Sequence, residues 1–186
     1  MDTLEEQLDG APDATILLAA DLVNLLQLPL VNVGQKGKAG RIRRMLTWLS
    51  EPRAPGPLLT YAWFEGSWHG GTGSNTMLWR ALFDMVNFLR EWWERPEDER
   101  ALALNDPWQW SATRNSARLT MPSTSHGLRY LGFPDFFLPI VNRDHKMRIR
   151  NAFISEIVNP TGDLDRDLFA ITVALQERTG GAVDYY

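Results

Sequence analysis

The stretch TMLWRALFDMVNFLREWWERPEDERALAL, residues 76–104, decides the fold class. Apolar side chains recur in it at i, i+4, i+7, i+11 and i+14: Leu78, Leu82, Met85, Leu89 and Trp92. This spacing predicts a helix with one buried face. Pro96 ends that helix and opens a second one, because the acidic residues that follow it suit the first turn of a helix.

The rest of the chain has the same helical character. We expect further helices over 13–28, 41–50, 126–133 and 161–181, with loops over 34–40 and 111–124. Asp106 is suited to a helix N-cap, Asp163 or Thr161 is expected to cap the helix over 161–181, and Asp144 is expected to cap a helix that begins at His145. The sequence therefore predicts an all-α fold, a single compact domain of roughly eight helices over residues 1–186.

Composition narrows the classes of function. The net charge is −4, so a nucleic-acid-binding role would need a local basic surface. The chain has no Cys, which excludes disulfides, thiolate zinc sites and Cys nucleophiles. Its three His lie far apart in the sequence, so we expect no His-rich metal site, and we expect no cofactor. The acidic N-terminus is unlike a signal peptide, and we expect a cytoplasmic protein without membrane spans.

The chain has eight Trp residues. Six of them stand at helical spacing and are expected to lie mostly in the core: Trp48, Trp79, Trp92, Trp93, Trp108 and Trp110. The other two are Trp63, which precedes a glycine-rich stretch, and Trp68, which lies within it; they are the candidates for a contact with a partner.

That stretch, GSWHGGTGSNT at 66–76, resembles a phosphate-binding loop only in part. Gly66 and Gly71 have the spacing of a Walker A motif, but Thr72 stands where its Lys belongs. We interpret the stretch as a turn into the long helix, with Trp68 and His69 as a contact loop. DLDRD at 163–167 likewise begins like an EF-hand, but Leu168 and Ala174 replace the required Gly and Glu.

Two basic clusters are the candidate DNA-binding residues. The first contains no acidic residue and comprises Lys36, Lys38, Arg41, Arg43 and Arg44. The second comprises Arg143, His145, Lys146, Arg148 and Arg150. If both lie on one face, an acidic protein gains a basic surface for DNA; the alternative is that each cluster is simply a solvated helix face.

Several segments together resemble a region found N-terminal to McrB-like AAA+ NTPases of modification-dependent restriction systems. They are a glycine-rich turn at 71–75, DPWQW at 106–110, LGFPDFFLPI at 131–140 with His145 and Lys146, and DLDRDLFAI at 163–171 with the aromatic pair at 185–186. The resemblance spans about residues 14–186. The chain contains no Walker A or Walker B motif and no arginine finger.

The resemblance implies a non-catalytic domain that recognises DNA, including modified DNA, in an antiphage restriction system. Its partners would then be an AAA+ NTPase module and a nuclease subunit. A reader of modified bases commonly flips the base into an aromatic pocket, for which Trp63, Trp68 and His69 are the candidates. The alternative is a helical interaction or scaffold domain, which predicts scattered basic residues and an exposed apolar or aromatic patch.

Overall fold

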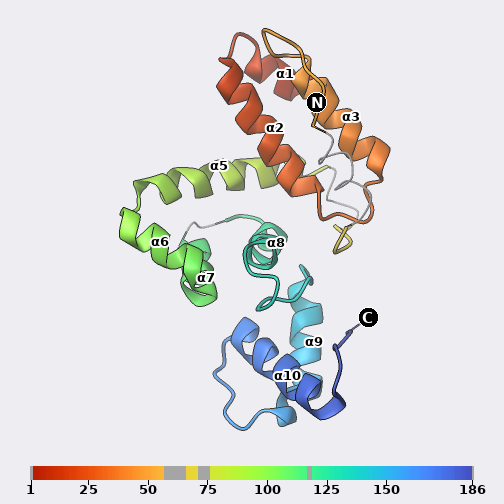
Figure 1. The fold of residues 1–186 in the computed structure, drawn as a ribbon, viewed down its shortest axis with the longest axis vertical. Coiled ribbons are helices and arrows are strands. Elements are labelled where there is room, and N and C mark those ends of the chain that lie inside the picture. The colour runs from red at the N-terminus through yellow and green to blue at the C-terminus, as the bar shows by residue number, and fades with distance from the viewer. Residues whose placement is uncertain (1, 57–65, 71–75, 117–118, 186) are drawn as a thin grey trace. The chain divides into compact units, whose positions relative to one another are not determined.

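The computed structural model describes residues 2–56, 66–70, 76–116 and 119–185. Its helices, shown in Figure 1, are α1 (Asp2–Leu8), α2 (Asp13–Gln27), α3 (Gln35–Leu46), α5 (Leu78–Glu94), α6 (Glu97–Asn105), α7 (Pro107–Ser116), α8 (Pro122–Gly132), α9 (Arg143–Phe153), the short 3-10 helix η1 (Ile154–Glu156) and α10 (Leu164–Thr179). No β-strand occurs within these described ranges. The predicted all-α class is confirmed.

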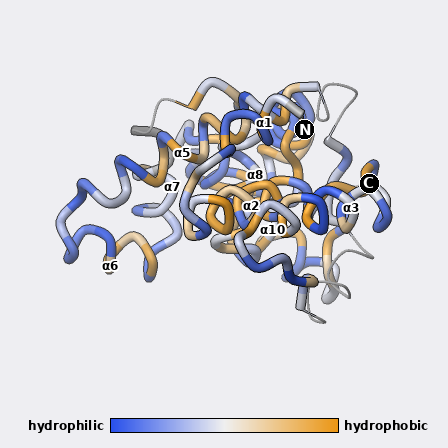
Figure 2. Tube along the Cα trace, turned by 90° about the horizontal axis from the view of Figure 1, so that it is seen from above, coloured by the Kyte–Doolittle hydropathy of each residue, from blue (hydrophilic) through white to orange (hydrophobic). Residues whose placement is uncertain are grey.

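The chain divides into two compact units, Met1–Val86 and Asn87–Tyr186, and α5 contributes to both. The single domain expected from the sequence stays a prediction. Figure 2 colours the chain by hydropathy, and apolar and hydrophilic residues alternate along its helices, as expected where each helix buries one face.

In the first unit, α2 and α3 lie side by side (Figure 1) and form the core between them. Ile16, Ala20 and Val23 of α2 pack against Ile42 and Met45 of α3, and all five are almost fully buried. Partly buried side chains from α1 and from the start of α5 close this core. The apolar residues at the start of α5 thus pack against the core of the first unit.

The glycine-rich segment 34–40, expected to be a loop, is instead the beginning of α3. Gly has a low helix propensity, but tertiary packing overrides it here. Ala39 is buried, and a Cβ placed on Gly37 would lie 3.3 Å from the side chain of Val33, so a small residue suits this approach. Burial of one face therefore decides where this helix starts.

Residues 66–70 run beside the segment that follows α2. The Ser67 amide donates to the Pro29 carbonyl at 2.7 Å, and the Val31 amide donates to the Trp68 carbonyl at 2.9 Å. A Cβ on Gly66 would lie 2.7 Å from the backbone carbon of Leu30, so only Gly fits there. The first part of GSWHGGTGSNT thus has a structural role, whereas the turn expected over 71–75 lies outside the described residues.

In the second unit, aromatic side chains fill the space between the helices. The Trp110 ring meets those of Phe88 and Trp92 edge-on, at centroid distances of 5.7 and 5.8 Å. Its indole N–H donates to the Leu128 carbonyl at 3.1 Å, and a Cβ on Gly132 would lie only 2.6 Å from the same nitrogen. Trp110 therefore joins α5, α7 and α8.

Helix ends follow the sequence signals where a capping side chain is present. Asp106 accepts from the amides of Trp108 and Gln109, Asp163 accepts from the Arg166 amide, and Gly180 ends α10 with φ of 70°. These ends were expected.

Three helix ends differ from the expectation, namely the start of α9, the end of α7 and the start of α8. Asn142, not Asp144, caps α9, accepting from the Asp144 and His145 amides. The loop expected over 111–124 is mostly helical, because α7 continues to Ser116 and α8 begins at Pro122. Pro122 at the first helical position marks the start of α8, which no capping side chain marks.

Candidate functional site

The first basic cluster is divided between the surface and the interior. Lys36 and Arg43 are seven residues apart and are exposed on the same side of α3. Lys38, in contrast, is only 1% exposed. The Lys38 ammonium donates to the Leu28 carbonyl at 2.6 Å, at the C-terminal end of α2. Loss of water around this group lowers the pKa of Lys38. The expected DNA contact at Lys38 is therefore corrected: this residue caps a helix from inside the fold.

Other members of this cluster also have partners within the first unit. Arg44 forms an ion pair with Glu5 of α1 at 2.7 Å, in which the two side chains are 46% and 44% exposed. Arg41 is half-buried. The basic character of the cluster at the surface thus rests mainly on Lys36 and Arg43.

The second basic cluster is divided between solvent and a contact with α10. Lys146 and Arg150 are four residues apart on α9, and they pair with two buried aspartates at the start of α10. The Lys146 ammonium is fully buried and lies 2.6 Å from the Asp165 carboxylate. The expected DNA contact at Lys146 is corrected for this reason, whereas Arg143, His145 and Arg148 remain exposed.

Asp165 is the centre of a buried polar network. Besides Lys146, it meets the Arg129 guanidinium of α8 at 3.4 Å. Both cations also lie 3.2 Å from Nδ1 of His126. Burial and the positive charge of Lys146 lower the pKa of His126 to about 3, so the ring is neutral and its Nδ1 accepts from both cations. The network joins α8, α9 and α10.

Asp167 anchors the loop before α10. Its carboxylate accepts from the Thr161 amide at 2.7 Å and from the Thr161 hydroxyl at 2.8 Å, and it pairs with Arg150 at 2.7 Å. Burial raises the pKa of this carboxyl, but the bonds from Thr161 and Arg150 outweigh that effect and hold it below its usual range. The DLDRD segment thus supplies structural ion pairs to α8 and α9.

The two basic clusters belong to different compact units, so their expected convergence on one DNA-binding face stays a prediction. The contact loop also stays a prediction. His69 is exposed, but Trp68 is half-buried and its backbone is bound to Pro29 and Val31. Trp63 lies outside the described residues.

A surface of a different kind runs along α5. Trp79, Phe83, Val86 and Trp93 are 67%, 57%, 51% and 70% exposed. Their spacing of four, three and seven residues places them on one side of the helix, together with the exposed Arg90. We name these five residues the α5 face. Sequence reasoning placed Trp79 and Trp93 in the core, and this is wrong.

Arginines lie at both ends of the α5 face. The Arg80 guanidinium is 6.0 Å from the Trp79 ring centroid, and that of Arg100 is 4.8 Å from the Trp93 ring centroid. Cation–π contacts of this kind orient an exposed indole but leave most of its surface open. The face is therefore aromatic, with an arginine beside the indole at each end.

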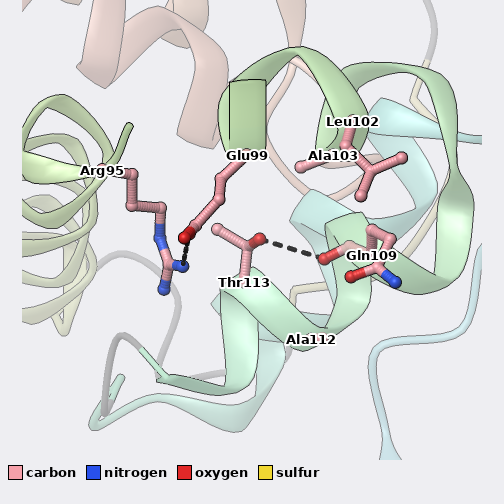
Figure 3. A pocket seen from close by; sticks show the side chains of 7 residues that line it. All are labelled: Arg95, Glu99, Leu102, Ala103, Gln109, Ala112 and Thr113. Carbon is pink, nitrogen blue, oxygen red and sulfur yellow. Dashed lines mark hydrogen bonds and ion pairs between the residues drawn. The ribbon is translucent and has the colours of Figure 1, made fainter. Parts of the chain in front are cut away.

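The cavities offer less chemistry. A hollow of about 220 Å³ lies between α6 and α7. Figure 3 shows its lining side chains, among which Arg95 pairs with Glu99 and the Thr113 hydroxyl donates to the Gln109 carbonyl. This volume is smaller than that of a usual ligand site, roughly 300–1,000 Å³. A cleft of about 700 Å³ beside α1 is open and largely acidic, and its ionic groups include the Arg44–Glu5 pair.

Comparison with protein-family models, with curated proteins and with solved structures finds no match. The resemblance to the region before McrB-like NTPases thus stays an expectation. In the described part of the chain, no helix has the length and apolar character needed to cross a bilayer, and no group of three acidic or His side chains could hold a metal ion.

Proposed function

We propose that this chain is a protein-interaction module that docks another polypeptide on the α5 face. The single observation that carries the proposal is the exposure of two Trp and one Phe side chains on one side of a regular helix. Such residues are the usual anchors of protein interfaces.

The size of the face supports this function. The four apolar side chains together leave roughly 500 Å² open to solvent, from the full area of each residue type and its exposed fraction. Patches of this size are at the upper end for a monomer and commonly mark an interaction site. At about 25 cal/mol per Å², covering this area removes on the order of 10 kcal/mol of unfavourable hydration before the costs of association are subtracted.

The shape of the face indicates a helical occupant. A straight apolar ridge along one helix matches the groove-and-ridge packing of a second helix at an axial distance of roughly 8–10 Å. The occupant would present its own apolar side chains at i, i+3 or i+4 and i+7 spacing. The arginines at the rim favour carboxylates at the edges of that helix.

Thiol labelling in cells tests the proposal, since the chain has no native Cys. Phe83→Cys introduces a thiol on the α5 face, and Val158→Cys introduces one at a position that is 93% exposed. We expect Phe83→Cys to react with a bulky maleimide at least fivefold more slowly in the natural host cell than as purified chain at nanomolar concentration. Val158→Cys should react alike in both. Equal rates for Phe83→Cys in the two settings would refute the proposal.

DNA recognition within an McrB-like restriction system is the second candidate. It is favoured by α3, which has no acidic residue and keeps Lys36 and Arg43 exposed seven residues apart. Fluorescence anisotropy with unmodified and 5-methylcytosine duplexes over a salt series tests it. Binding that weakens steeply with salt and is lost in Lys36→Glu/Arg43→Glu would support a DNA role, and no binding at low salt would contradict it.

A further inference from the structure

We propose that the helix docked on the α5 face is α5 of a second copy, in antiparallel orientation, with a two-fold axis at Val86. This inference rests on the proposed function and adds the identity of the partner. It is carried by the spacing of the exposed residues along α5, the charges at the edges of the face, and its area.

The apolar spacing is self-complementary about Val86. Trp79 and Trp93 each lie seven residues from Val86, which is about 10.5 Å along the axis in either direction. Seven residues complete nearly two turns, so both indoles lie on the side of the helix that carries Val86. Rotation about an axis at Val86 therefore brings Trp79 of one copy to the level of Trp93 of the other, at both ends of the pair.

The remaining two members of the face also become partners. In this arrangement Arg90 is level with position 82 of the second copy, one residue or about 1.5 Å from Phe83. An arginine beside a phenyl ring makes a favourable cation–π contact. The positive charge in the middle of an otherwise apolar face thus meets an aromatic partner instead of apolar aliphatic surface.

The edges of the face carry complementary charges. Arg80 and the exposed Glu94 lie on the same edge of α5, at opposite ends of the face. An antiparallel pair keeps equivalent edges together and brings Glu94 of one copy within two residues, about 3 Å along the axis, of Arg80 of the other. Symmetry forms this ion pair twice. A parallel pair would separate the same two groups by 14 residues, about 21 Å.

The area is sufficient for a stable though modest dimer. Two copies of the face bury on the order of 1,000 Å² in total. Specific interfaces begin at about this size, and two-fold dimers are the commonest assemblies of a single chain. The area thus indicates a dimer that dissociates on dilution.

Disulfide trapping tests the position of the axis. Val86→Cys places the only thiol of each chain at the axis, and Leu18→Cys on α2 is a matched control, since Val86 and Leu18 are 51% and 50% exposed. Under mild oxidation at micromolar concentration, we expect Val86→Cys to form a covalent dimer at least tenfold faster than Leu18→Cys. Trp79→Cys alone should not cross-link, but it should cross-link with Trp93→Cys in a mixture.

A charge exchange tests the orientation without relying on cross-linking. In sedimentation equilibrium, Arg80→Glu and Glu94→Arg should each weaken the dimer about tenfold, because two pairs become repulsive at once. The combined exchange should restore the wild-type dissociation constant to within about threefold. Rescue of this kind requires Arg80 and Glu94 of different copies to meet.

A wild-type chain that sediments as a monomer up to 200 μM, with Val86→Cys no faster than Leu18→Cys, would overturn self-pairing. So would a dimer that the two single charge reversals leave unchanged. Neither result decides the proposed function, since protection of Phe83→Cys in cells does not depend on which polypeptide covers the face.

Discussion

The most informative perturbation of the second unit is His126→Asn. His126 Nδ1 accepts from Lys146 and Arg129 at 3.2 Å each, and a proton on this nitrogen would face both cations. An Asn carbonyl oxygen reaches a similar position and still accepts, but it does not titrate. The substitution thus removes the ionisable group while keeping the acceptor of the network.

The expected change in the free energy of unfolding with pH follows from the pKa of His126 in the folded and unfolded chain. The pKa of His126 is about 3 in the folded chain and about 6.5 when the ring is unperturbed. Between these values the unfolded chain binds one more proton than the folded chain, so the free energy of unfolding falls as the pH falls. The loss is about 1.4 kcal/mol for each pH unit inside this window, or about 2.5 kcal/mol between pH 7.5 and pH 4.5. The pKa of Asp167 is held below its usual range, so the titration of this carboxylate in the folded chain lies outside the interval from pH 7.5 to pH 4.5.

Urea unfolding followed by Trp fluorescence at pH 7.5 and pH 4.5 measures this difference. We expect wild type to lose about 2.5 kcal/mol, and His126→Asn to lose less than about 1 kcal/mol over the same interval. His145→Asn removes an exposed histidine and should behave like wild type. A His126→Asn chain with the full wild-type loss of stability would refute the assignment of a neutral, cation-flanked ring.

Two further substitutions test how the first unit is held together. Lys38→Met removes the ammonium that caps α2 and should lower the free energy of unfolding by about 1–3 kcal/mol in urea titration. Lys36→Met, at an exposed position two residues away, should change the free energy of unfolding by less than about 0.5 kcal/mol. Gly66→Ala places a methyl group against Leu30 and should cost about 1–3 kcal/mol; Gly40→Ala on α3 meets nothing within 4 Å and should raise the melting temperature slightly. Equal effects within either pair would contradict the roles assigned to Lys38 and Gly66.

The sequence predicts the helical class because that class depends on local patterns. The apolar spacing along α5 and the caps at Asp106 and Asp163 need only residues within a few positions of each other. The start of α3 was missed because its glycines disfavour a helix locally, and only packing of Ala39 and Gly37 against α2 and its following segment reverses that preference.

Most contacts of the candidate site could not be predicted from local sequence patterns. A Lys at a given position looks alike whether it binds phosphate or an internal partner, and Lys146 finds Asp165 only because α9 and α10 pack together. The α5 face, in contrast, is visible as a pattern in the sequence. Trp79, Phe83, Val86 and Trp93 have helical spacing of their own, on a different side from the stripe led by Leu78. A helix with two apolar stripes has more surface to cover than one core requires.

Photo-cross-linking from the α5 face tests most directly whether a polypeptide covers this face. Phe83→p-benzoylphenylalanine places a reactive ketone on that face, and the same group at Val158 is the control. On irradiation in the natural host cell, we expect a covalent polypeptide adduct from position 83 and none from position 158. An adduct of twice the 21.2 kDa chain mass indicates self-pairing, and another mass indicates a different protein partner. No adduct from position 83 would contradict the claim that a polypeptide covers this face.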